Sequence, residues 1–152
     1  IHSASHKYNQ IYTSEQAFFD DLEQMNSIIK AQTGNDASII RFPGGSSNTV
    51  SKDYCPGIMT QLVNDVTARG LLYCDWNVSS GDANSKPIST EQVVQNVISG
   101  VQSHNVSVVL QHDIKDFSVN AVEQIIQWGQ ANGYTFLPLT TSSPMSHHRV
   151  NN

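Results

Sequence analysis

Two kinds of apolar segment alternate along this chain, and the alternation limits the folds open to it. Apolar residues recur at helical spacing over residues 13–30, 57–69, 89–101 and 119–131. Short apolar runs typical of strands occupy residues 38–42, 71–74, 106–110 and 134–139. The run at 106–110 is apolar almost throughout, which indicates a strand covered on both faces. The order predicts an α/β protein with a parallel sheet, which we expect to curl into a barrel.

Residues at the ends of these segments support their assignment. Thr13 and Ser89 each precede a helical pattern and have a glutamine three residues later, as in a capping box. Ser118 is placed to cap the last helix, and Gly34 to end the first. We therefore expect four helices joined to the strands by turns, with no internal repeat or linker.

Composition narrows the class of protein. With 152 residues and 38% hydrophobic content, the chain is predicted to form one domain, or most of one. Its net charge of −5, without a run of Lys or Arg, argues against nucleic acid or an anionic membrane as the partner. Only 14% of residues are charged, which suits a secreted protein that handles neutral polymers. Cys55 and Cys74 form either a disulfide or two buried apolar sites.

The longest polar segments follow the predicted strands. They begin at Arg41, Asp75 and Leu110, whereas the turns after the helices are short. In barrels of alternating strands and helices, the chemistry is built on the loops that follow the strands. These three loops are therefore the first places to look for functional residues.

A pair of histidines opens the chain. His2 and His6 are four residues apart, so in a helix both imidazoles would lie on one face and could bind one divalent metal ion. Neutral imidazole suits zinc and its first-row neighbours, and a catalytic zinc has three protein ligands. The alternative is two surface histidines near a mobile terminus.

Arg41 and the glycines that follow it are the next candidates. A guanidinium at the end of an apolar strand orients a catalytic acid or forms an ordinary ion pair at the rim. Gly44 and Gly45 permit close backbone approach and could direct an N–H at an oxyanion, although such a pair is more often a simple turn.

Three further candidates follow later strands. Asp75 could hold a histidine ring and raise its pKa, and Trp76 could shield a small apolar group from water; otherwise they are a loop cap and a core aromatic residue. His112 could act as a general acid near neutral pH, or be a satisfied core histidine. His104, His147 and His148 are predicted to be surface residues.

In their order along the chain, these clusters resemble the second to fifth motifs of the NodB-like polysaccharide deacetylases, carbohydrate esterase family 4. The matching clusters are His2–His6 (HSASH), Arg41–Gly45 (RFPGG), Asp75–Trp76 (DW) and Leu110–His112 (LQH). Residues 73–83, YCDWNVSSGDA, are similar to the subgroup found in Gram-positive cell-wall deacetylases. The resemblance spans nearly the whole chain.

The resemblance implies a distorted NodB-like (β/α) barrel and metal-dependent removal of acetyl groups from a polysaccharide. The expected reaction is N-deacetylation of N-acetylglucosamine in peptidoglycan or a chitin-like polymer. Alternatives are O-deacetylation of acetylated xylan, or a carbohydrate-binding protein that keeps the fold without the chemistry. It also implies a location outside the cell or on its surface, in a bacterium of the Gram-positive type.

The resemblance also assigns roles near the metal. His2 and His6 correspond to two ligands of Zn²⁺, or of another first-row ion such as Co²⁺. Arg41 corresponds to the residue that positions the catalytic base. Pro43 and Gly44 correspond to the wall of the substrate groove, and the Gly44 N–H helps to bind the oxyanion.

The remaining roles belong to the later motifs. His112 corresponds to the general acid that protonates the departing amine, and Asp75 to the residue that tunes its pKa. Trp76 and Leu110 correspond to the pocket for the acetyl methyl group. On this basis we expect His112 and Asp75 to act as a coupled pair.

Two departures from the family pattern qualify these expectations. Where Gly44 stands, the commoner third motif has an aromatic residue, so we expect a more open groove. The first motif, an Asp-Asp pair that supplies the base and the third metal ligand, is expected upstream of Ile1. We therefore interpret the chain as an N-terminally truncated catalytic domain of low activity by itself, in which Asp53 or Asp82 are the candidates to replace the missing carboxylate.

Overall fold

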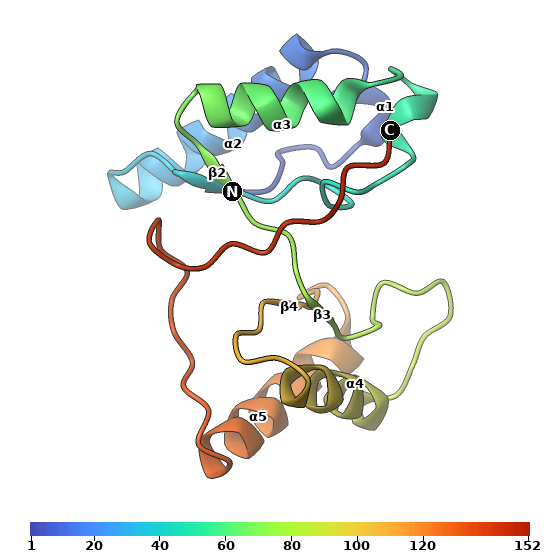
Figure 1. Cartoon of the computed structure of the whole chain (residues 1–152), viewed down its shortest axis with the longest axis vertical. Coiled ribbons are helices and arrows are strands. Elements are labelled where there is room, and N and C mark those ends of the chain that lie inside the picture. The colour runs from blue at the N-terminus through green and yellow to red at the C-terminus, as the bar shows by residue number, and fades with distance from the viewer. The chain divides into compact units, whose positions relative to one another are not determined.

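The computed structural model describes all 152 residues, which group into two compact units (Figure 1). Unit 1 consists of Ile1–Asp75 together with Thr140–Asn152, and unit 2 of Trp76–Leu139. The assignment of residues 1–152 to one catalytic domain stays a prediction. No helix in either unit is both long enough and apolar enough to cross a membrane.

Unit 1 is built on a short parallel strand pair. Its elements are α1 (Tyr8–Ile11), α2 (Glu15–Thr33), β1 (Ile39–Ile40), the 3₁₀ turn η1 (Ser51–Asp53), α3 (Ile58–Ala68) and β2 (Leu72–Tyr73). Ile39 pairs with Leu72 and Ile40 with Tyr73. On the other edge of β1, the Ile1 amino group donates to the Ile39 carbonyl at 2.8 Å, and the Arg41 N–H donates to the Ile1 carbonyl at 2.9 Å. The backbone entering the histidine segment is thereby fixed to β1.

The core of unit 1 lies among α2, α3 and the strands. Helix α3 presents its apolar residues at helical spacing, and Ile58, Met59, Leu62 and Val66 are each fully buried. Helix α2 adds Phe18, Phe19 and Leu22, and the segment after β1 adds Phe42. Phe42 thus anchors the start of the loop that follows β1 in this core.

Unit 2 repeats the parallel pairing. Its elements are β3 (Val78–Ser79), α4 (Thr90–Gln102), β4 (Val109–Leu110) and α5 (Asp116–Ala131). Val78 pairs with Val109 and Ser79 with Leu110. Helices α4 and α5 pack against each other around Val93, Val94 and Ala121 (Figure 1). The loops after β3 and β4 are consequently neighbours at one end of this pair.

The α/β class, the four long helices and the parallel pairing are confirmed, with several corrections. Ser14, not Thr13, caps α2. Lys115 precedes α5, and Ser118 lies buried within that helix instead of capping it. The strand expected over 134–139 does not form, whereas β3 lies inside a segment expected to be a loop. Val106 is exposed, so the run 106–110 is not a strand covered on both faces. Closure into a barrel remains a proposal.

Both cysteines are free thiols. Cys74 is buried, as the second alternative predicts, whereas Cys55 is only partly buried against the core of unit 1.

The cap of α4 offers a first test. The Ser89 hydroxyl accepts the Gln92 N–H at 3.1 Å, as the capping pattern predicts. Replacing Ser89 with Ala should lower the free energy of unfolding of unit 2 by about 1 kcal/mol, because one N–H at the helix start loses its acceptor. Urea denaturation monitored in unit 2 measures the change. Replacing Ser103 at the other end of α4 with Ala is the control, and an equal loss there would contradict the capping role.

Candidate functional site

The two histidines of the N-terminal segment converge although the segment is not helical. Residues 1–7 form an extended edge and a bend, and α1 begins only at Tyr8. The Nε2 atoms of His2 and His6 nevertheless lie 3.2 Å apart. The expected helical arrangement is therefore corrected, while the expected meeting of the two rings is observed.

The geometry of the pair fits a metal ion. Two nitrogens that bind one tetrahedral zinc ion at its usual bond length lie roughly 3.3 Å apart. His2 Nδ1 lies 2.7 Å from the Arg41 carbonyl and donates to it, which leaves Nε2 as the unprotonated atom. Burial lowers the pKa of His2, which favours the neutral form that a metal needs. No third His, Cys, Asp or Glu completes a metal-binding group.

The RFPGG segment forms a tight turn beside this pair. The Gly45 N–H donates to the Phe42 carbonyl at 2.7 Å, with Pro43 second in the turn and Gly44 third at φ 77°. Proline followed by a left-handed glycine defines a type II turn. The Tyr12 hydroxyl donates to the Pro43 carbonyl at 2.7 Å. The buried Tyr12 thus anchors the turn to the core of unit 1.

Tyr8 fills the space that opens above Gly44. A Cβ placed on Gly44 would lie 2.5 Å from the Tyr8 hydroxyl oxygen and 3.0 Å from Asn48 Cβ. The Tyr8 side chain from α1 therefore occupies the space that a side chain at residue 44 would enter. The more open groove expected from sequence stays a prediction.

Gly44→Ala should destabilise unit 1 by about 2 kcal/mol, since it combines a left-handed φ with this close contact. Urea midpoints measure the effect. Gly34→Ala is the matched control, because Gly34 has φ 78° and a Cβ added there would have nothing within 4 Å. Gly44→Ala combined with Tyr8→Phe should recover part of the loss. Equal losses for Gly44→Ala and Gly34→Ala would show that Tyr8 does not constrain the turn.

Arg41 and Asp75 connect this turn to the end of β2. Arg41 Nε and an η-nitrogen donate to the Cys74 and Asp75 carbonyls at 3.1 and 3.2 Å. The buried Asp75 carboxylate accepts the Ser46 N–H at 2.8 Å, the Ser46 hydroxyl at 2.5 Å and the His148 N–H at 2.8 Å. Asp75 therefore holds the loop after β1 and the segment around residue 148 together. His148 is half-buried, unlike the surface residue expected from sequence.

In unit 2, the carboxylate that contacts His112 is Asp82, in place of the expected Asp75. Asp82 accepts from His112 Nδ1 at 2.8 Å and from its backbone N–H at 2.7 Å. It also accepts the Ser118 hydroxyl at 2.6 Å, and its side chain is 1% exposed. His112 Nδ1–H is fixed as a donor, so Nε2 is left as the ring atom able to exchange a proton with a substrate.

The remaining candidates lie at the borders of these strands. Trp76 is half-buried two residues before β3, and Leu110 ends β4 opposite Ser79. Asp53 is exposed in η1. Asp82 and Asp53 are the two carboxylates considered as candidates for the base. Asp82 binds His112, and Asp53 contacts none of the histidines.

No family model matches the sequence. Over 140 residues the chain is 28% identical to a peptidoglycan-N-acetylglucosamine deacetylase of Bacillus cereus, a match that covers 90% of this chain and 48% of that protein. The chain thus spans about half the length of this curated relative. A CE4 esterase of Streptococcus mutans is 26% identical with a TM-score of 0.70, over 90% of this chain and 60% of that one.

A third similarity is much closer. The catalytic domain of a peptidoglycan N-acetylglucosamine deacetylase from Eubacterium rectale is 99% identical, with a TM-score of 0.99 over 100% of this chain and 69% of that one. The chain belongs to the polysaccharide deacetylases of carbohydrate esterase family 4.

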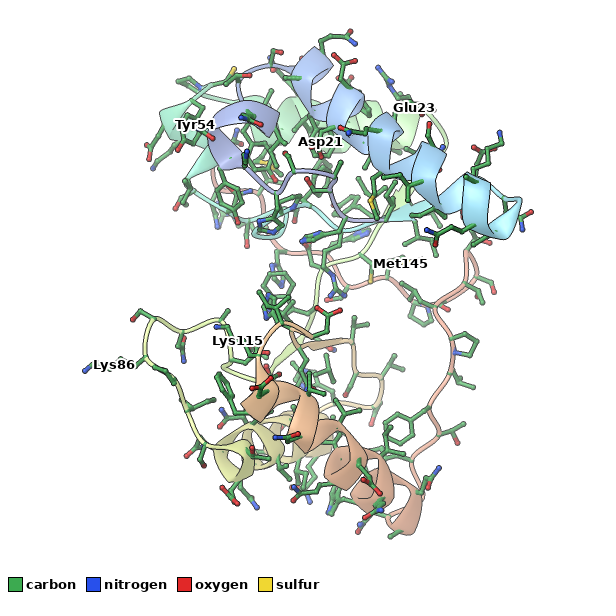
Figure 2. All side chains as sticks on the ribbon, turned by 180° about the vertical axis from the view of Figure 1, so that it is seen from behind. Asp21, Glu23, Tyr54, Lys86, Lys115 and Met145 are labelled. Carbon is green, nitrogen blue, oxygen red and sulfur yellow. The ribbon has the colours of Figure 1, made fainter.

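Two acidic residues of this polysaccharide deacetylase have contacts that the sequence does not predict. Asp82 lies in the loop after the short strand β3, and a polar residue after a strand can indicate a functional site. This signal is hidden because the sequence around β3 predicts a loop and no strand. Asp21, on the face of α2 toward the histidine segment, gives no signal, because one acidic residue on a helix has many possible partners (Figure 2).

Proposed function

We propose that the protein removes the acetyl group from N-acetylglucosamine residues of a cell-wall glycan, outside the cell or on its surface, with the help of a divalent metal ion. Membership of the deacetylase family supports the reaction class. The names of two relatives, both peptidoglycan N-acetylglucosamine deacetylases, support the substrate. The abundance of neutral polar residues, with only 14% charged, is consistent with a neutral sugar polymer.

The observation that carries this proposal is the histidine pair. His2 and His6 present their Nε2 atoms 3.2 Å apart, and one ring is already oriented by the Arg41 carbonyl. Zn²⁺ or Co²⁺ would be held by these two atoms. Such an ion lowers the pKa of a bound water and polarises the acetamide carbonyl.

His112 supplies the proton that amide cleavage needs. An amine leaves poorly unless it is protonated as the C–N bond breaks. Asp82 holds Nδ1–H, so that the imidazolium Nε2–H is the proton available to the departing nitrogen. The products are acetate and a free amino sugar.

The other residues orient the substrate. The Gly44 N–H, at the third position of the turn, would donate to the developing oxyanion. Trp76 and Leu110 would contact the acetyl methyl group. Arg41 positions the turn and the His2 ring through its backbone, and its side chain holds the end of β2.

The test is deacetylation by the full-length protein. N-acetylglucosamine oligomers and peptidoglycan glycan fragments are incubated with apoprotein and with added Zn²⁺ or Co²⁺, and free amines are measured by fluorescent labelling and mass spectrometry. Metal-dependent amine release supports the proposal. Acetate release from acetylated xylan without amine release would assign an O-deacetylase instead. Glycan binding without any release of acetate would assign a carbohydrate-binding protein.

A further inference from the structure

The segment between the two histidines is organised by one carboxylate from a different element. Asp21 lies near the start of α2, on the side facing residues 3–5 (Figure 2). Its Oδ2 accepts the Ser3 hydroxyl at 2.5 Å and the Ala4 N–H at 3.0 Å. Its Oδ1 accepts the Ser5 N–H at 2.9 Å. Three donors thus converge on two carboxylate oxygens.

The same network reaches His6. The Ser3 hydroxyl donates to Asp21 and, in turn, accepts the His6 backbone N–H at 2.9 Å. His6 has φ 54°, and it is the only residue other than glycine with a positive φ. A side chain with a Cβ is unfavourable in that region and stays there only where its surroundings hold it.

This conformation is what brings the two rings together. The His2 ring is fixed by the Arg41 carbonyl, and its backbone follows β1 through Ile1. The His6 ring has no such fixed strand behind it, and its Nε2 reaches 3.2 Å from His2 Nε2 through the turn at residues 3–6. Strand β1 therefore orients the His2 ring, and Asp21 on α2 orients the His6 ring.

We propose that Asp21 is a positioning residue for the histidine pair: by holding the turn at residues 3–6, it sets the separation of the two imidazoles for a divalent cation. This inference rests on the proposed metal-dependent function. Asp21 touches neither ring. It acts through Ser3 and the backbone of residues 4 and 5.

Replacing Asp21 with Asn tests the role of the carboxylate while keeping the size of the side chain. Asp21→Asn keeps the shape but replaces one acceptor oxygen with an NH₂ donor, which would face a hydroxyl or N–H. We expect its affinity for Co²⁺ or Zn²⁺, measured by calorimetric titration of the full-length protein, to fall about 10–100-fold, as when other outer residues around metal ligands are lost. Asp20→Asn is the matched control: Asp20 is the exposed neighbour on α2, accepts only from Gln16, and should bind like wild type.

A double-mutant cycle distinguishes positioning from a general loss of stability. Ser3→Ala removes the hydroxyl that relays Asp21 to His6. Asp21→Asn should therefore cost less affinity in that background than in wild type, and the remaining loss should come from the bonds to the Ala4 and Ser5 N–H groups. Additive losses would show that Asp21 does not act through Ser3 and would overturn the proposed route. Affinity unchanged in Asp21→Asn, with wild type binding normally, would overturn the inference itself.

A second readout does not require metal. Amide hydrogen exchange at Ala4, Ser5 and His6 should be slow in wild type and in Asp20→Asn. In Asp21→Asn it should be faster by a factor on the order of ten, because local opening sets the exchange rate. If wild type binds neither ion, the metal-dependent function fails, and exchange then decides whether Asp21 holds the turn. Unchanged exchange in Asp21→Asn would refute the structural role as well.

Discussion

Replacing His112 with Ala should reduce deacetylation by the full-length protein about 10²–10⁴-fold, the usual contribution of a positioned acid. The physical reason is that the leaving nitrogen then departs without a proton donor. Because His112 is not one of the two proposed metal ligands, metal affinity should not change. Amine release from an N-acetylglucosamine oligomer, together with metal content, measures both quantities.

His104→Ala is the matched control for this experiment. His104 is an exposed histidine of the same unit, and its ring bonds only to the Gly100 carbonyl, so its loss should leave turnover unchanged. Turnover by His112→Ala close to that of wild type would mean that His112 is a structural partner of Asp82 and that the acid is another group.

Asp82→Ala should cause the largest loss of stability, about 3 kcal/mol in the free energy of unfolding of unit 2. The Ser118 hydroxyl and the His112 N–H would be left without an acceptor, and each unsatisfied buried group costs about 1–3 kcal/mol. Asp113→Ala, at an exposed neighbouring carboxylate, should cost less than about 0.5 kcal/mol. Urea denaturation of the three proteins gives the comparison.

This stabilisation should also depend on pH in one direction. Burial alone would raise the pKa of Asp82, but hydrogen bonds from Ser118 and His112 outweigh it and hold the pKa below the usual 3.8. A carboxylate with a lowered folded-state pKa stabilises fully above its unfolded pKa, and that stabilisation is lost as the pH falls through the folded value. The difference between wild type and Asp82→Ala should therefore stay constant down to about pH 5 and shrink only below about pH 4. A gap that closes near neutral pH would contradict the assignment of Asp82 as the anionic partner.

The regular elements could be predicted because their signals are local. Ser89 and Gly34 carry the capping chemistry of the helices they border, and α3 shows its buried face in its spacing. The strands were harder to predict from the sequence. Each contains only two paired residues, so β3 inside YCDWNVSSGDA is hidden among polar neighbours, and the apolar run at 134–139 forms no ladder. A short strand is defined by its partner, which a single segment does not reveal.

Candidate residues for the site could be named from the sequence, but most of their contacts could not. His2 and His6 meet as predicted, through a turn instead of a helix. The partner of His112 is different from the predicted one, because the sequence offers both Asp75 and Asp82 for one imidazole. Only the register of β3 with β4 brings Asp82 to His112.

The bond between Asp75 and the His148 N–H has a consequence for the order in which the chain can fold during synthesis. These residues are 73 positions apart, so a ribosome that has released all of residues 1–75 has not yet made the last donor for a fully buried carboxylate. Loops of this length close slowly compared with the local contacts of α2 and α3. The two strands and the helices of unit 1 can assemble early. The Asp75 carboxylate, however, stays hydrated or bonded to Ser46 alone until the whole of unit 2 has emerged and the His148 N–H is available. A nascent chain stalled before residue 148 should accordingly expose the 46–48 loop to protease, whereas the released protein should protect it.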